Sequence, residues 1–386
     1  MASFLGVKVP FFDFLMGSEW RRRAGEPGIC DFVTGNSQEL PLSAFGAALR
    51  RGAEPHRPDW FSYKMNEPAS CAVVAASLQA RLGVAFRPRQ ILMTNGAIAG
   101  LAVALRALTD PGDEVLILCP PFFAYEPMVR GRGATPVLVH LTAPDFALDL
   151  DAVAEAITPR TRAIILNSPH NPTGRVYAAA ELEELGAVLE QASQRYGRPV
   201  YLLSDEAFSR LVFDGRHYDT PTKFYAKSLL IYTYSKTLLT PGERLGFLAI
   251  PPDMPDPEAV QAALFMAQIG TGWAFPNAVL QHALADIDGL SIDVAQLQAK
   301  RDRMVEGLRE IGYETSLPEG TFYMIARAPV ADDNAFCAAL AKQDIFVLPG
   351  SVMELPGYFR ISLTATEDMI ERSLPGFEKV WTQASD

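Results

Sequence analysis

The sequence lacks the features of a disulfide-stapled, zinc-binding or membrane-spanning protein. Its four cysteines, Cys30, Cys71, Cys119 and Cys337, lie far apart without CxxC or Cys/His spacing, so neither a disulfide framework nor a zinc site is indicated. The opening stretch MASFLGVKVPFFDFLMGSEW has no basic first region and carries Asp13, which is typical of neither a signal peptide nor a membrane span. We expect reduced, mostly buried thiols and an ordered N-terminal arm.

Positive charge is also scarce. Lys and Arg total 34 against 45 Asp and Glu, a net charge of −11, which argues against a nucleic-acid surface and fits a cytoplasmic protein with no membrane partner. Any phosphate must therefore be held locally by a few groups. The 386 residues, 49% of them hydrophobic, suffice for one large domain and a smaller one.

Short apolar runs alternate with helical lengths from about residue 90: QILMT, EVLILC, AIILN, PVYLLSD, SLLIYTYS and GFLAI. Because both faces of these runs are apolar, they predict an α/β fold with a mostly parallel sheet sandwiched by helices. After about residue 255, long helices such as VAQLQAKRDRMVEGLREIG precede short strands in TFYMIAR, IFVLPG and YFRISLT, which predicts a smaller α+β domain. We place the arm, which belongs to the small domain, at residues 1–45, the large domain at 46–285 and the small C-terminal domain at 286–386.

Chemically distinctive residues follow four of the predicted strands, where parallel sheets bind ligands. Gly96 opens a helix whose free N–H groups suit a phosphate, and Asn171 lies between two prolines in SPHNPTG. Asp205 ends PVYLLSD, and Lys236 follows SLLIYTY. Each has an ordinary reading on its own: Gly96 turns a corner, Asp205 caps a helix formed by EAFSRLVF, and Lys236 extends to solvent.

Together these residues indicate one kind of ligand. Phe122 and Phe123 add an aromatic face in PPFFAYEP, directly after EVLILC. An anion cradle, an aromatic face, an amide, an acid and a lysine suit a phosphorylated heterocycle with a ring nitrogen to protonate and an aldehyde to capture. That ligand is pyridoxal 5'-phosphate, for which proteins supply a lysine Schiff base and an acid at the pyridine nitrogen.

At these motifs the sequence resembles the fold-type I, class I/II pyridoxal-phosphate aminotransferases, from about Gly35 to Arg360. SPHNPTG, SDEAF, YSKTLLTPGERLGF, PEGTFY and YFRISLT occur in the family order, and PPFFAYEPM is similar to the kynurenine aminotransferase and cysteine-conjugate lyase branch. The resemblance implies an enzyme that acts on an L-amino acid and a 2-oxo acid through a lysine aldimine. It also implies a homodimer whose sites use residues of both subunits.

The resemblance assigns catalytic roles to Lys236, which carries the aldimine and moves a proton, and to Asp205, which pairs with the pyridine nitrogen. It implies that Asn171 bonds the ring hydroxyl and that Phe122 stacks on the ring. The implied phosphate ligands are the backbone of Gly96, Ala97 and Ile98, with Thr233, Arg244 and, from the second subunit, Tyr63. The implied substrate contacts are Arg360 at the α-carboxylate, Asn171, and a closing loop at Gly35 and Asn36.

Two positions depart from the family pattern. The family's Asp-Glu-x-Tyr is Asp205-Glu206-Ala207-Phe208 here, so a phenol is replaced by phenylalanine, and Pro68 stands where a glycine usually follows Tyr63. The missing phenol keeps a lyase, cyclase or oxidase of an amino acid open as the alternative, and the sequence does not decide the substrate. A transcription regulator built on this fold is disfavoured, because the arm of roughly forty residues is too short for a winged-helix domain.

Overall fold

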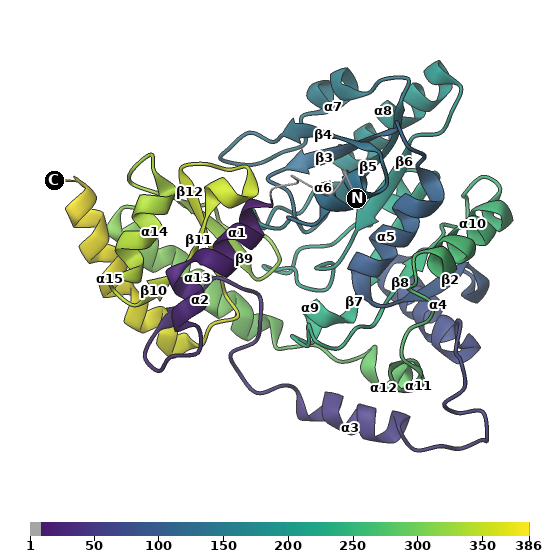
Figure 1. Ribbon diagram of the computed structural model, residues 1–386, viewed down its shortest axis with the longest axis horizontal. Coiled ribbons are helices and arrows are strands. Elements are labelled where there is room, and N and C mark those ends of the chain that lie inside the picture. Colours follow the sequence, from purple (N-terminus) through teal and green to yellow (C-terminus); the bar gives the residue numbers. More distant parts are fainter. Residues whose placement is uncertain (1–8, 386) are drawn as a thin grey trace.

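The computed structural model describes residues 9–385; residues 1–8, the start of the predicted arm, and residue 386 lie outside the described residues. The described chain contains a seven-stranded sheet, a three-stranded sheet and a two-stranded sheet (Figure 1). Helices pack on both faces of the largest sheet, which confirms the predicted α/β fold.

The seven-stranded sheet has the order β2-β8-β7-β6-β5-β3-β4. Its strands are parallel except β8, which runs antiparallel to both β2 and β7. Six of the seven strands correspond to the predicted apolar runs; the edge strand β4 was not predicted. The bounds are β2 (Ile91–Thr94), β3 (Glu114–Cys119), β4 (Thr135–His140), β5 (Thr161–Asn167), β6 (Tyr201–Asp205), β7 (Ser228–Thr233) and β8 (Gly246–Ala249).

Alternate residues of the central strands enter opposite helical layers. In β3, Val115 and Ile117 pack with α5 and α10, whereas Leu116 and Leu118 pack with α7 and α8. Both faces of the central strands are therefore buried, which explains why these strands are continuous apolar runs in the sequence. The helices are α3 (Ser43–Gly52), α4 (Pro68–Leu82), α5 (Gly96–Leu108), α6 (Tyr125–Gly131), α7 (Leu150–Ala156), α8 (Ala179–Tyr196), α9 (Tyr234–Thr237), α10 (Pro257–Gly270), α11 (Ala278–His282) and α12 (Leu284–Ile287), with 3₁₀ turns η1 (Pro88–Gln90) and η2 (Pro221–Lys223).

The two smaller sheets lie beside the N-terminal and C-terminal helices (Figure 1). β12 (Tyr358–Ser362) pairs antiparallel with β9 (Tyr323–Arg327) and β11 (Leu348–Pro349), while β1 (Cys30–Asp31) pairs with β10 (Ile345–Phe346). The predicted strand IFVLPG is thus two short strands in different sheets. The flanking elements are α1 (Pro10–Gly17), α2 (Glu19–Arg23), α13 (Val294–Ile311), α14 (Asp333–Ala341), α15 (Glu367–Ser385) and η3 (Gly350–Met353).

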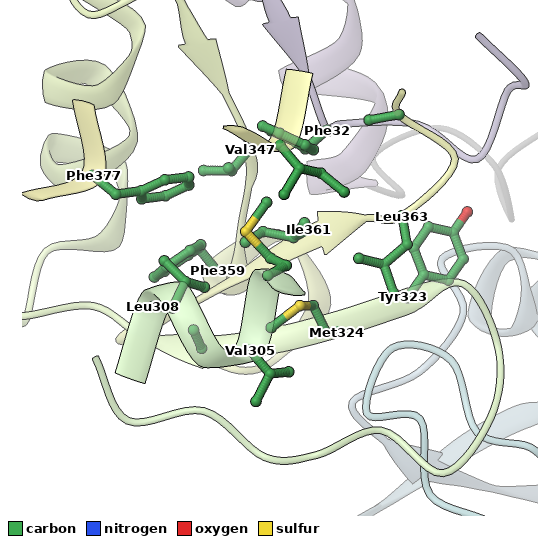
Figure 2. Packing of buried hydrophobic residues seen from close by; sticks show 14 of the residues in the cluster. Phe32, Val305, Leu308, Tyr323, Met324, Val347, Phe359, Ile361, Leu363 and Phe377 are labelled. Atoms are coloured by element: carbon green, nitrogen blue, oxygen red, sulfur yellow. The ribbon is translucent and has the colours of Figure 1, made fainter. Parts of the chain in front are cut away.

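A further apolar core packs the three-stranded sheet against α13, α14 and α15. Phe359 of β12 lies with its ring 6.0 Å from that of Phe377 of α15, and both belong to the same buried cluster as Leu308 of α13 and Phe32 (Figure 2). Ala207, Phe208, Leu211 and Phe213, from the segment after β6, also belong to this cluster. The division into domains with boundaries at residues 45 and 285 therefore stays a prediction. No helix within residues 9–385 is long and apolar enough to cross a membrane.

The helix predicted for EAFSRLVF is wrong. Residues 206–213 form turns with i to i+3 hydrogen bonds, from Ser209 N–H to the Glu206 carbonyl and from Leu211 N–H to the Phe208 carbonyl. Further along, Phe213 N–H donates to the carbonyl of Glu319 at 2.9 Å. Backbone groups that a helix would use internally therefore bond a distant segment instead.

Candidate cofactor and substrate site

The carboxyl ends of β5, β6 and β7 open into a cavity of about 430 Å³. Most of the predicted site residues line it, because parallel strands end at the same edge of a sheet. They are Gly35, Ala97, Ile98, Phe122, Asn171, Asp205, Thr233, Lys236, Arg244 and Arg360. The phenylalanine that departs from the family pattern, Phe208, also lines this cavity.

A cradle for an anion forms where α5 begins. Gly96 has a φ of +79°, and a Cβ there would lie 2.7 Å from Arg244 Nη2 and 3.3 Å from Thr233 Oγ1, so no larger residue fits. Gly246 of β8 makes this approach possible, since a Cβ on it would lie 2.9 Å from the Gly96 Cα. The first N–H groups of α5 therefore face the same space as a guanidinium and a hydroxyl.

Arg244 is held in the cradle without an acid. It donates to the hydroxyl of Ser235 at 3.2 Å and to the Pro241 carbonyl at 2.9 Å, and it forms no ion pair with the part of the chain that the structure describes. Burial lowers its pKa, because nothing offsets the loss of water. Ser235 was not predicted, although its place between Thr233 and Lys236 in TYSK was a usable signal.

Lys236 lies in the short helix α9, directly after β7. Thr233 caps this helix by accepting from Ser235 N–H at 3.3 Å, which fixes where the lysine leaves the strand. The Lys236 Nζ lies 5.7 Å from the ring centroids of both Phe208 and Phe322, at the limit of a cation–π contact. The amine thus faces the cavity between two rings.

Asp205 is buried at the end of β6 and hydrogen-bonded on both oxygens. The Tyr125 hydroxyl donates to its Oδ2 at 2.6 Å, and Ala207 N–H donates to its Oδ1 at 3.2 Å. Burial raises the pKa of Asp205, and these two donors and the charge of Lys236 oppose the rise. The alternative role as a helix cap is wrong because no helix follows. Tyr125 was not predicted; its only signal was its position in PPFFAYEP.

Asn167 ties the asparagine loop to the sheet. Its Nδ2 donates to the Asp205 carbonyl at 2.8 Å, and its Oδ1 accepts from Asn171 N–H at 2.8 Å. Inside the loop, His170 is buried with Nδ1 2.8 Å from the Thr173 hydroxyl, and burial lowers its pKa to about 3. A neutral histidine is consistent with the structural role predicted for it.

Arg360 enters the cavity from β12. It donates to Asn171 Oδ1 at 3.3 Å and to the Val33 carbonyl at 2.9 Å, and its guanidinium lies 4.0 Å over the Tyr323 ring. Its Nε is buried without a hydrogen-bond partner, and it forms no ion pair within residues 9–385. Burial lowers the pKa of Arg360. A buried guanidinium with spare donors suits a carboxylate ligand.

The family model described as aminotransferase class I and II matches residues 44–375. The chain belongs to this family. It is 31% identical over 367 residues to a probable aspartate/prephenate aminotransferase of Thermus aquaticus, covering 92% of this chain and 89% of that one. It is 35% identical over 285 residues to a probable N-succinyldiaminopimelate aminotransferase of Mycobacterium tuberculosis, covering 70% and 68%.

Solved structures show the same relation. A crystal structure of an aminotransferase from Eubacterium rectale superposes with a TM-score of 0.92 at 30% identity, over 100% of this chain and 98% of that one. The aspartate aminotransferase of Thermus thermophilus with maleate gives a TM-score of 0.82 at 26% identity, over 97% and 96%. The resemblance inferred from the motifs is confirmed, and the chain is a pyridoxal-phosphate-dependent enzyme like its family.

The residues of this aminotransferase fit the cofactor. The cradle at Gly96 is open where a Cβ would fill it, and Arg244 supplies an unpaired cation for a phosphate. Across the same cavity lie a lysine amine for an aldehyde and a buried acid for a ring nitrogen. The donor set therefore matches each polar group of pyridoxal phosphate.

Three predicted residues stand outside the cavity lining. Gly96 contributes through its backbone at the cradle, and Asn36 is adjacent to the lining residue Gly35. At Gly35 itself a Cβ would lie 2.6 Å from Phe322 Cε2, so this loop packs tightly. Tyr63 is 98% exposed and contributes nothing to the cavity of its own subunit; its donation to a second subunit stays a prediction.

Proposed function

We propose that this enzyme holds pyridoxal phosphate covalently on Lys236 and transfers the amino group of an L-amino acid to a 2-oxo acid. The observation that carries the proposal is the set of groups in one cavity: an amine, a buried acid and two cations without ion-paired acids, Arg244 and Arg360. One cation matches a phosphate and the other a carboxylate, and the amine lies in the same cavity.

The proposal gives each side chain one task toward the cofactor. The N–H groups of Gly96, Ala97 and Ile98 hold the phosphate with the hydroxyls of Thr233 and Ser235 and the guanidinium of Arg244. Phe122 covers the ring, and the Asn171 amide bonds the ring hydroxyl. Asp205 keeps the ring nitrogen protonated, and Tyr125 holds its carboxylate in place.

On the substrate side, Arg360 binds the α-carboxylate in a fork of two donors, beside Asn171 and the loop at Gly35 and Asn36. Bound pyridoxal phosphate supplies an electron sink that stabilises the charge left on Cα when its proton departs. The free amine of Lys236 would take that proton as general base. The aromatic walls around its Nζ exclude water from the transfer.

Phe208 favours a second candidate, a lyase, cyclase or oxidase of an amino acid. Its buried ring lines the cavity where the family carries a phenol. A site without that phenol keeps the cofactor, because Asn171, Asp205 and Arg244 are all present, but it changes how the cofactor's proton is held. Products identified by mass from an amino acid with and without a 2-oxo acid separate the two candidates.

The proposed function is tested by mapping the lysine that carries the cofactor. Borohydride reduction of the loaded enzyme is expected to fix the cofactor on the peptide containing Lys236 and nowhere else. Lys236→Arg should abolish the adduct and the amino-group transfer. Lys64→Arg is the control, because Lys64 is a buried lysine that is paired with Asp59 and Glu67. An adduct that maps to another lysine refutes the proposed site.

We also propose a cytoplasmic location. Four free, buried cysteines and a net charge of −11 support it, because reduced thiols are typical of reducing compartments.

A further inference from the structure

An aromatic row runs from the N-terminal arm to the acid of the site. The ring of Phe11 in α1 stacks on that of Phe123 at 4.1 Å with an interplanar angle of 11°. Phe123 contacts Phe122 at 4.5 Å, and Phe122 meets Tyr125 edge-on at 5.5 Å. Tyr125 in turn donates to Asp205. All five residues line the cavity, so helix α1 builds one of its walls.

The aromatic wall packs against β11 and η3. Phe11 is only 8% exposed and belongs to a buried cluster with Val33, Leu348 and Met353. Val33 is also the residue whose carbonyl accepts from Arg360. The residue that accepts from Arg360 therefore packs in the same cluster as Phe11, which favours the aromatic wall as the substrate end of the cavity.

The charges of the cavity are accounted for by the proposed function. Among the lining residues that the structure describes, the cations are Lys236, Arg244 and Arg360, and these serve the cofactor aldehyde, its phosphate and the substrate α-carboxylate. A second carboxylate on the substrate finds no further cation among the described residues that line this subunit's cavity. Next to the faces of aromatic rings, which are electronegative, an unpaired carboxylate is unfavourable.

We propose that Phe11 and Phe123 form the subsite for the substrate side chain and select an aromatic or large apolar side chain over an acidic one. The proposal rests on the proposed function, because it takes Arg360 as the α-carboxylate site. A flat apolar side chain continues the row of rings and removes its own surface from water. The substrate is thus an aromatic or bulky apolar L-amino acid.

The test uses two probes, succinate and 3-phenylpropanoate, which differ only in carrying a carboxylate or a phenyl group on carbon 3 of the same three-carbon acid. Calorimetric titration of the cofactor-loaded enzyme is expected to show 3-phenylpropanoate binding at least about tenfold tighter than succinate. Phe11→Ala should weaken 3-phenylpropanoate by about ten- to a hundredfold and leave succinate nearly unchanged. Cofactor absorbance and thermal unfolding of each variant establish that it is folded and loaded.

Phe14→Ala is the matched control. Phe14 lies in the same helix and the same apolar cluster, but it lines a different cleft, with Trp20 and Cys337, so its removal should change neither affinity. The preference of the unmodified enzyme between the two probes tests the proposal even if Phe11→Ala does not fold.

Two results overturn the inference: succinate binding as tightly as 3-phenylpropanoate, which points to a cation supplied by another subunit, or equal losses in Phe11→Ala and Phe14→Ala. These outcomes differ from a failure of the proposed function. If no amino acid passes its amino group to a 2-oxo acid while 3-phenylpropanoate still binds through Phe11, the subsite stands and the reaction assignment falls. If transfer occurs but aspartate is preferred to phenylalanine, the reaction assignment stands and the subsite falls.

Discussion

Arg244 and Arg360 are the residues whose placement makes least sense without ligands. Removing an unpaired guanidinium from water is unfavourable, most of all at the buried Arg360 and less at the half-buried Arg244. In each case only neutral carbonyl, amide or hydroxyl oxygens replace the lost water. By contrast, the buried Lys300 and Arg301 pair with Glu39 and Asp214. The positions of Arg244 and Arg360 without ion pairs therefore reflect ligand binding rather than stability of the fold.

At Phe208 the loss of a phenol leads to a prediction about the cofactor's proton. With phenylalanine there, the Asn171 contact alone would stabilise the ring hydroxyl as an anion, so the bound chromophore should keep its proton to higher pH than a site with the phenol. Phe208→Tyr should lower that pKa by about one to two units, since a hydrogen bond to a charged oxygen is worth roughly 1.5–3 kcal/mol. The measurement is a pH titration of the cofactor absorbance.

Phe208→Leu serves as the control for this titration, because it removes the ring beside Lys236 without adding a donor and should move the pKa less than Phe208→Tyr. If Phe208→Tyr binds cofactor and titrates like the unmodified enzyme, residue 208 does not face the ring hydroxyl.

Among the elements, strands that are buried on both faces could be predicted from the sequence. Segments whose backbone hydrogen-bonds to residues far away in the sequence could not. The central strands read correctly because both faces are dry. β4 was missed because it is a partly exposed edge strand beginning Thr-Pro. The segment 206–213 has a helical composition, yet its backbone bonds residues 319–321, a contact that no local pattern shows.

The same contrast holds within the site. The shared cavity of Lys236, Asp205, Asn171 and Arg360 could be predicted because these residues follow or occupy strands within motifs. Tyr125 was missed because its partner lies 80 residues away, so only the folded sheet brings the phenol to the acid. Phe11 was missed because its neighbours, Phe123 and the β11 layer, come from two distant parts of the chain.

The turn after β6 also buries an acid that the proposed reaction does not use. Glu206 is 1% exposed; its Oε1 accepts from the hydroxyls of Thr220 at 2.5 Å and Ser204 at 3.0 Å, and its Oε2 has no partner. Burial raises the pKa of Glu206 to about 7 from 4.5, and the hydroxyls of Thr220 and Ser204, the nearby Tyr218 and the charge of Arg81 oppose the rise.

This acid makes stability fall as pH rises. Between pH 4.5 and about 7 the folded protein binds a proton at Glu206 that the unfolded chain has lost, so its contribution is full at low pH and disappears through pH 7. The loss amounts to about 3 kcal/mol at most. Glu206→Gln, which stays neutral, should remove this slope in urea unfolding measured from pH 5 to 8.5. The exposed Glu155→Gln should retain it; equal slopes for all three proteins would show that Glu206 is ionised throughout.

The whole molecule leaves large apolar side chains uncovered next to the phosphate cradle. Two segments carry them, residues 61–66 and 266–273. Both segments bond Met93 of β2: the Asn66 side chain accepts from Met93 N–H at 2.7 Å, and the Gln268 side chain donates to the Met93 carbonyl at 2.8 Å. The exposed side chains are Phe61, Tyr63, Met65, Met266, Ile269 and Trp273. A surface of this kind is typical of a contact between subunits.

We therefore expect a symmetric homodimer in which Tyr63 reaches the phosphate cradle of the other subunit. Tyr63→Phe should keep the dimer and weaken cofactor binding about tenfold, since a hydrogen bond to a charged oxygen is lost. Met266→Glu should shift the protein toward monomer in light scattering and reduce cofactor occupancy with it. Leu317→Glu is the control, because Leu317 is comparably exposed at 46% but lies outside the two segments, and it should leave the mass unchanged. A monomer at micromolar concentration with full cofactor occupancy would contradict this assembly, because one subunit would then hold the phosphate without the partner's hydroxyl.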